Sequence, residues 1–225
     1  MAQRCPWLND WNSFCGGTLG RMAPYRTSLM ISSVPHLPDW RIIEAGDDDR
    51  ADLARFCIAN PDYDILLTGE VPEPAPWVED FLTDLPPADF NPGPTAKLVV
   101  RPASGDEIAA ILDVTLGMID PHVAHIGLFQ VAQARHGAGL AHQLYHALET
   151  WLAGQGMEAV RLGVLTNNPR AAAFWSRHGY GPLRQRSAVL DSGRTVVTEV
   201  RVKRLVPMTL AAYLARVPRD APSAP

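Results

Sequence analysis

The segment of this chain best suited to chemistry runs from Val131 to Ala141 and reads Val-Ala-Gln-Ala-Arg-His-Gly-Ala-Gly-Leu-Ala. Its small residues, Gly137 and Gly139 among them, let the backbone approach a ligand closely. An amphipathic helix pattern follows, and the first turn of a helix has N–H groups without a partner inside the helix. Because such N–H groups bind anions, the segment predicts a cradle for a diphosphate.

Other interpretations of this loop differ in how well its spacing supports them. Small residues at the start of a helix also permit tight packing of the helix on a strand, so packing is an alternative for the loop taken alone. A nucleotide P-loop is excluded because no Gly-Lys-Ser or Gly-Lys-Thr follows. A dinucleotide fingerprint also fails, because Leu-Ala-His follows Gly139 and no third glycine is in place.

The elements that must position this loop follow from the periodicity of the sequence. Apolar and alternating runs predict strands over 97–101, 108–118 and 123–131, joined by turns into an antiparallel meander. A stripe of leucines four residues apart predicts a helix over 139–153. The alternating segment 158–165 then predicts a strand parallel to 123–131, because consecutive strand, helix and strand favour a right-handed crossover.

A polar residue begins the next predicted helix. Asn168 supplies an N-cap and Pro169 a first-turn proline for a short helix that runs to Arg177. The other predicted elements are a strand over 41–44, helices over 47–60 and 77–85, and a hairpin of strands over 184–190 and 195–203.

Length and composition limit the class of protein. A chain of 225 residues is long enough for one domain with a full core. The formal net charge of −4 gives no support for a nucleic-acid-binding protein. Three scattered cysteines (Cys5, Cys15 and Cys57) favour reduced thiols and a cytoplasmic location. Polar residues interrupt the first apolar run, so we expect neither a secretion signal nor a membrane span.

The predicted elements also define the domain organisation. Residues 1–38 lack a clear period, so we expect an N-terminal extension there, with Met30 as an alternative start. Residues 39–205 form the expected domain. We expect a C-terminal tail over 206–225, whose proline-rich end frays.

Two motifs stand on these elements in a defined order. The first reads His136-Gly137-Ala138-Gly139-Leu140-Ala141, and the second places Asn168, Ala171, Trp175 and Gly179-Tyr180 at spacings of three, four and four. This arrangement resembles the GNAT superfamily of acyl-CoA-dependent N-acetyltransferases, from the strand at residue 40 to residue 203. There the first motif begins with Gln or Arg, and the second has Tyr where this chain has Trp175.

The resemblance implies an α/β fold with a mixed, mostly antiparallel sheet flanked by helices, whose fourth and fifth strands part to admit coenzyme A. It implies acetyl transfer from acetyl-CoA, as a co-substrate, to a primary amine, with no metal. The positions expected to bind the coenzyme are Phe129, Gln130, Val131, His136, Gly137, Ala138, Gly139, Leu140, Ala141, Asn168 and Trp175.

Two departures from the family pattern affect the expected chemistry. His136 stands for Gln or Arg, and we expect this position to act through its backbone N–H. Trp175 stands for Tyr, and an indole N–H does not ionise usefully, so the acid that protonates the thiolate is elsewhere or is water. Tyr145 is another possible donor. The alternative function is a non-catalytic acyl-CoA-binding regulatory domain of the same fold.

Histidines offer a base for the amine, because their pKa lies near neutrality. His125 is the best candidate: it lies six residues before Val131 and shares its face if no bulge intervenes. A packing role for His125 is the alternative, and His122 is a rival at the strand entrance. His142 and His146 have a spacing that can bind metal, but without a third ligand we expect a plain helix surface.

Charge gives a further expectation about the acceptor. Between Glu44 and Phe90 there are thirteen acidic residues against only Arg50 and Arg55. An acidic rim attracts a cationic amine, although solvated helix faces and loops are the simpler explanation of these acids. Asn168, as a contact near the thioester, joins His125 as an expected catalytic position. We expect a monomer or a homodimer.

Overall fold

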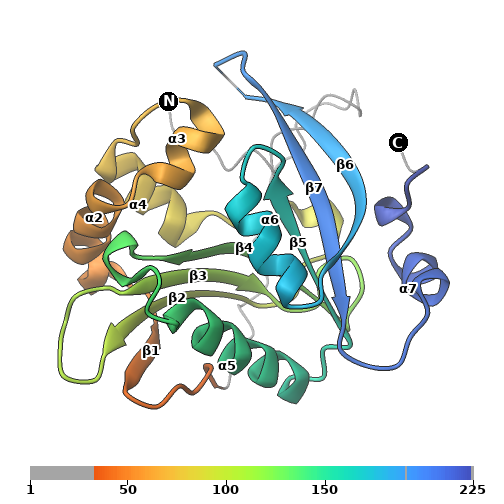
Figure 1. Ribbon diagram of the computed structural model, residues 1–225, viewed down its shortest axis with the longest axis horizontal. Helices are drawn as coiled ribbons and strands as arrows, with labels where there is room; N and C mark the ends of the chain where they lie inside the picture. Colours follow the sequence, from red (N-terminus) through yellow and green to blue (C-terminus); the bar gives the residue numbers. More distant parts are fainter. Residues whose placement is uncertain (1–32, 191, 224–225) are drawn as a thin grey trace.

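A single seven-stranded sheet organises the computed structural model, which describes residues 33–190 and 192–223 (Figure 1). The strand order is β1-β2-β3-β4-β5-β7-β6, and all neighbours are antiparallel except β4 and β5. The strands are β1 (Trp40–Glu44), β2 (Thr95–Pro102), β3 (Ala110–Thr115), β4 (Val123–Val131), β5 (Ala159–Leu165), β6 (Gly181–Val189) and β7 (Thr195–Arg204).

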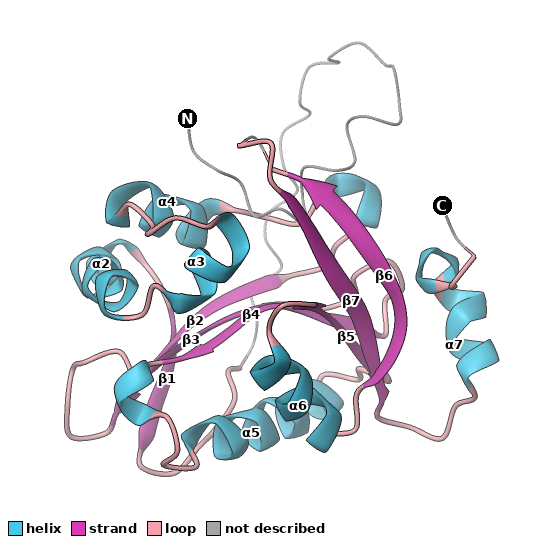
Figure 2. Cartoon of the chain, turned by 45° about the horizontal axis from the view of Figure 1, so that its top comes forward, coloured by secondary structure: helices cyan, strands magenta, loops and turns pink. Residues whose placement is uncertain are grey.

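Helices cover both faces of this sheet (Figure 2). One face carries α2, α3 and α4, and the other carries α5. The helices are α2 (Arg50–Ala59), α3 (Asp62–Thr68), α4 (Pro74–Thr83), α5 (Leu140–Gly154), α6 (Pro169–Arg177) and α7 (Leu210–Arg216), with 3-10 turns η1 (Asp47–Asp49), η2 (Ala88–Phe90), η3 (Gln133–Arg135) and η4 (Pro218–Asp220). Among the described helices, none has the length and apolar character needed to cross a membrane.

The core divides between these two faces. The larger hydrophobic cluster joins the sheet to the leucine stripe of α5, where Leu144, Leu148 and Leu152 are fully buried. The smaller cluster joins Leu53 of α2 and Phe81 of α4 to the other face. The alternation of apolar residues in the strands therefore supplies two buried surfaces, one for each helical layer.

The expected fold class is confirmed, including the meander of β2, β3 and β4 and the parallel pair of β4 and β5. The helix predicted over 47–60 ends at Ala59, and Pro61 is the N-cap of a helix that the sequence did not predict, α3, which Gly69 ends with a φ of 88°. Of the predicted N-terminal extension, residues 1–32 lie outside the described residues. Leu37, by contrast, is buried in the larger cluster, so the domain begins before residue 39.

Part of the predicted C-terminal tail, up to Asp220, packs on the sheet and does not fray. In α7, Tyr213 is fully buried, and Val217 follows it into a cluster with Val123 of β4. Asp220 is also fully buried and forms a two-pronged ion pair with Arg161 of β5, at 3.0 and 3.1 Å. These contacts attach the segment to the strands beside the site.

Candidate functional site

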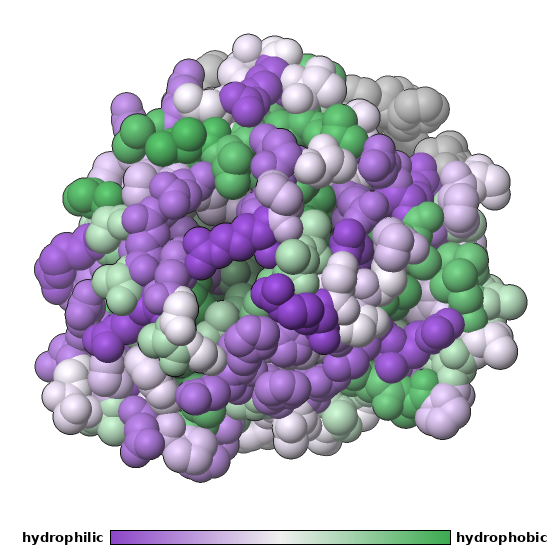
Figure 3. All heavy atoms as spheres, in the orientation of Figure 1, coloured by the Kyte–Doolittle hydropathy of each residue, from purple (hydrophilic) through white to green (hydrophobic). Residues whose placement is uncertain are grey.

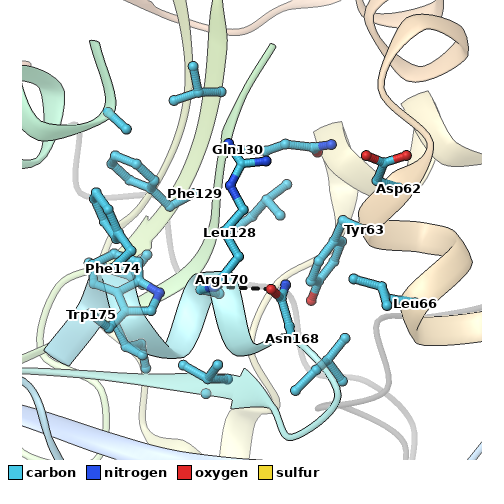
Figure 4. A pocket seen from close by; sticks show the side chains of 18 of the residues that line it. Asp62, Tyr63, Leu66, Leu128, Phe129, Gln130, Asn168, Arg170, Phe174 and Trp175 are labelled. Carbon is cyan, nitrogen blue, oxygen red and sulfur yellow. Dashed lines mark hydrogen bonds between the residues drawn. The ribbon is translucent and has the colours of Figure 1, made fainter. Parts of the chain in front are cut away.

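A pocket opens in the sheet where β4 and β5 separate (Figure 4). Among the described residues, the parallel pairing runs from Val123 opposite Ala159 to Ile126 opposite Leu162 and stops there. Beyond this point lies a pocket of about 480 Å³, between β4, β5, the start of α6 and α3. Figure 3 shows this face hollowed near its centre, with apolar residues inside the hollow. Two strand edges thus face each other across a space that an extended polar chain can enter.

Strand β4 carries a bulge at the edge of this pocket. Gly127 is an extra residue between the partners of Asp113 and Val114 in β3. A Cβ at position 127 would lie 3.2 Å from Asp113 Oδ2, which favours glycine there. The extra residue inverts the alternation along β4, so Ile126 and Val131 face the same cluster although five residues separate them.

The same bulge keeps His125 away from the pocket. His125 is absent from the described residues that line it, and its Nδ1 accepts a hydrogen bond from Arg161 Nη1 at 3.2 Å. Burial, reinforced by the charge of Arg161, lowers the pKa of His125 to about 3. The predicted shared face of His125 and Val131 is therefore wrong, and the packing alternative describes His125 better.

The glycine loop before α5 is open toward solvent. Gly137 and Gly139 have φ angles of 79° and 84°, a region that favours glycine. A Cβ at either position would meet nothing within 4 Å, so close packing of the helix does not explain these glycines. Within the described part of the chain, no side chain caps α5, whose first turn begins at Leu140. The loop has the geometry of an anion cradle, and its small residues serve backbone shape.

The side chain of His136 holds this loop to the end of β4, whereas the sequence led us to expect a role for its backbone N–H. Its Nε2 donates to the carbonyl of Val131 at 2.9 Å. Its backbone N–H donates to the carbonyl of Gln133 at 3.0 Å, so the expectation that this N–H binds the ligand is wrong. His136 and Val131 both line the pocket, whereas the side chain of Leu140 is buried in the core.

An aromatic wall forms one side of the pocket, and we use this term for Phe129, Phe174 and Trp175. The ring of Phe129 lies edge-on to Trp175, with centroids 5.5 Å apart, and stacks with Phe174 at 5.9 Å. Beside the wall, Asn168 Oδ1 accepts from the N–H of Ala171 at 3.0 Å, which confirms the predicted N-cap. Asn168 also lines the pocket, so both of its expected roles are compatible with its position.

Tyr145 is not placed to protonate a leaving group in this pocket. It is fully buried, does not line the pocket, and donates to the hydroxyl of Tyr180 at 3.2 Å. Burial raises its pKa above the ordinary value of tyrosine.

The histidines of α5 and α6 do not form a metal site. A hydrogen bond of 2.9 Å connects a ring nitrogen of His142 to one of His178. The described residues contain no group of side chains suited to hold a metal ion.

The opposite side of the pocket comes from α3, and we call Asp62, Tyr63 and Leu66 the α3 wall. Figure 4 shows them across the pocket from the aromatic wall. Arg170 of α6 also lines the pocket. The periodicity of the sequence does not predict the α3 wall, because a helix of seven residues is too short to show a clear period. Its signals were a proline at the start, acids in the first turn and Gly69 at the end.

Asn60 fixes the α3 wall to β4. Its Nδ2 donates to the carbonyl of Phe56 at 2.7 Å, and its Oδ1 accepts from the N–H of Gln133 at 2.7 Å. Its own carbonyl accepts from Nε2 of Gln130 at 2.9 Å. Asn60 is buried, so these three bonds couple the end of α2 to the strand that borders the pocket.

Asp64 lies directly behind this wall. Its Oδ1 accepts from the indole N–H of Trp77 at 3.2 Å. Burial nevertheless raises the pKa of Asp64 to about 6, because the indole bond only partly offsets the loss of water. Asp64 is absent from the described pocket lining, so it supports the wall without facing the cavity.

Comparisons with known proteins agree with this arrangement. A model of the acetyltransferase (GNAT) family matches residues 61–180. No curated protein sequence matches the chain. Among solved structures, an acetyltransferase from Thermus thermophilus is 24% identical, with a TM-score of 0.58 over 76% of this chain and 99% of that chain.

Two further structures resemble the chain in fold. The spermidine N-acetyltransferase of Vibrio cholerae, solved with CoA and spermine, is 13% identical, with a TM-score of 0.56 over 78% of this chain and 98% of that chain. The ribosomal-protein-S18-alanine N-acetyltransferase of Escherichia coli is 12% identical, with a TM-score of 0.53 over 76% and 97%. The family model spans more than half of the residues, and both motifs lie at the pocket, so the chain belongs to the GNAT family of acetyltransferases.

Proposed function

We propose that this protein transfers an acetyl group from acetyl-CoA to a primary amine. The observation that carries the proposal is the juxtaposition of the open glycine loop with the gap between β4 and β5. The diphosphate binds the backbone amides of Gly137, Gly139, Leu140 and Ala141, and the pantetheine arm enters the gap along Gln130 and Val131. Family membership supports the reaction class.

The reaction needs little from ionisable side chains. The neutral amine nitrogen forms a bond to the acyl carbon, the carbon–sulfur bond breaks, and one proton leaves the nitrogen for water. The released thiolate takes one proton from water. Backbone N–H groups of β4 beside Phe129 polarise the carbonyl oxygen, and the pocket walls hold the reactants together.

Water is the proton carrier in this proposal because His125, Tyr145 and Trp175 do not serve for proton transfer in the pocket. His125 and Tyr145 do not reach the pocket, and the indole N–H of Trp175 does not ionise usefully. Asn168 contacts the arm near the thioester while it caps α6. The cytoplasmic location and the monomeric or dimeric state stay predictions from the sequence.

The second candidate function is an acyl-CoA-binding domain without turnover, and the tryptophan at position 175 is the observation that favours it. To separate the two, the purified full chain is mixed with acetyl-CoA and a panel of primary amines, and thiol release is followed with a chromogenic disulfide. Acetyl transfer predicts CoA release well above the amine-free rate for at least one amine. Tight acetyl-CoA binding without release for any amine favours the binding domain.

A further inference from the structure

The acceptor side of the pocket presents a carboxylate without a cation. Asp62 lies on the α3 wall and lines the pocket. Its side chain is exposed, and within the described residues it forms no ion pair, although Arg50, Arg55 and Arg101 neutralise acids of the neighbouring helices. Its place in the first turn of α3 gives it some stabilising role. That role leaves its negative charge available to a ligand.

A second acceptor atom without a donor lies in the same wall. Gln130 Nε2 donates to the carbonyl of Asn60, which fixes the orientation of the amide. Gln130 Oε1 is then buried and accepts no hydrogen bond within the described part of the chain. Asn60 cannot supply a donor, because its Nδ2 is bonded to Phe56. A buried acceptor without a donor is costly, so a bound donor there is favourable.

The Asp62 carboxylate and the Gln130 amide lie on the same side of the pocket. The bond from Gln130 ends on Asn60, two residues before Asp62, and Figure 4 shows the Gln130 amide pointing toward Asp62. An ammonium group has three donors, one positive charge and no acceptor. It therefore complements a site made of a carboxylate and an unpaired amide oxygen.

We infer that Asp62 and Gln130 bind a second, protonated nitrogen of the acceptor, so that the preferred substrate is a diamine. The inference rests on the proposed acetyl transfer and specifies its acceptor. One nitrogen, neutral, reaches the thioester, and the other stays charged against the α3 wall. Asp62 is a specificity-determining residue in this scheme, because it touches the acceptor away from the reacting atoms.

The positive charge of Arg170 would favour a different acceptor, one that carries a carboxylate. Arg170 lines the pocket from α6, and a carboxylate on the acceptor is its natural partner. Arg170 lies two residues after Asn168, which is proposed to contact the arm near the thioester, so Arg170 borders the same part of the pocket as the acceptor. A zwitterionic acceptor is thus the competing outcome, and the experiment includes it.

The test compares acceptors that differ in charge alone. Linear monoamines, α,ω-diamines and ω-amino carboxylates with three to six carbons are assayed by CoA release. We expect the best diamine to exceed the monoamine of equal length by about tenfold in kcat/KM. In Asp62→Asn the ratio of diamine to monoamine kcat/KM falls to about one. Asp48 is exposed and is not among the described residues that line the pocket, so Asp48→Asn is the matched control and leaves the diamine preference unchanged.

Each outcome decides the inference. Equal rates for diamines and monoamines at every length, or an Asp62→Asn variant with an intact diamine preference, overturn it and leave acetyl transfer standing. A preference for ω-amino carboxylates indicates that the acceptor pairs with Arg170, and this result also overturns the diamine inference. If no amine releases CoA, the proposed function fails; calorimetric titration of 1,5-diaminopentane into the chain with CoA then tests Asp62 alone. Loss of binding in Asp62→Asn supports the site, and unchanged binding refutes it.

Discussion

Replacing Asp220 with alanine is expected to destabilise the domain strongly, although Asp220 lies only five residues before the end of the chain. Its carboxylate is fully buried, accepts two bonds from Arg161 and accepts a third from the hydroxyl of Tyr213 at 2.6 Å. The substitution leaves a guanidinium buried without its counter-charge. Breaking a buried pair in this way costs about 3–5 kcal/mol of unfolding free energy.

Equilibrium unfolding in urea measures this loss. Asp89→Ala is the matched control, because its ion pair with Arg219 is partly exposed at 3.4 Å and is worth less than about 1 kcal/mol. Arg161→Met removes the buried guanidinium. In that variant Asp220→Ala therefore lowers the unfolding free energy much less than it does in the wild type. A loss below about 1 kcal/mol for Asp220→Ala alone would refute the claim that this segment is anchored.

Two further predictions concern stability and pH. The pKa of His125 is about 3 in the folded chain, below its unfolded value, so His125 contributes a loss of stability of at most about 5 kcal/mol as pH falls from about 6.5 toward 3. His125→Gln removes this contribution, and a variant whose stability changes with pH as that of the wild type does would contradict the burial argument. The raised pKa of Asp64 acts in the opposite direction: stability falls by at most about 3 kcal/mol as pH rises from 4 to 6. Asp64→Asn, which keeps an oxygen for Trp77, should abolish that fall in urea unfolding across this range.

The sequence predicted the parts of the fold whose signals are local. The alternation in β2 to β5 and the leucine stripe of α5 each mark a surface that must be buried, so their pairing and crossover followed. The glycine loop could also be predicted from the sequence, because the positive φ angles at Gly137 and Gly139 favour glycine at both positions. Seven of the positions expected to bind the coenzyme line the pocket, and they are Phe129, Gln130, Val131, His136, Ala141, Asn168 and Trp175.

The errors arose where structure depends on distant partners. The extra residue Gly127 places His125 on the opposite face of β4 from Val131. A single glycine in a strand pattern does not by itself predict a bulge. Asp220 looks like a solvated tail residue until Arg161, fifty-nine positions earlier, is known to lie beside it. The α3 wall was missed because a helix this short shows its ends more clearly than its period.

The most direct test of this account is a crystal structure of the full chain with acetyl-CoA. We predict the diphosphate within hydrogen-bond distance of the backbone amides between Gly137 and Ala141, and the pantetheine arm between β4 and β5 with its thioester beside Phe129 and the α3 wall. Coenzyme bound elsewhere, or a diphosphate held by side chains remote from the glycine loop, would contradict the central claim.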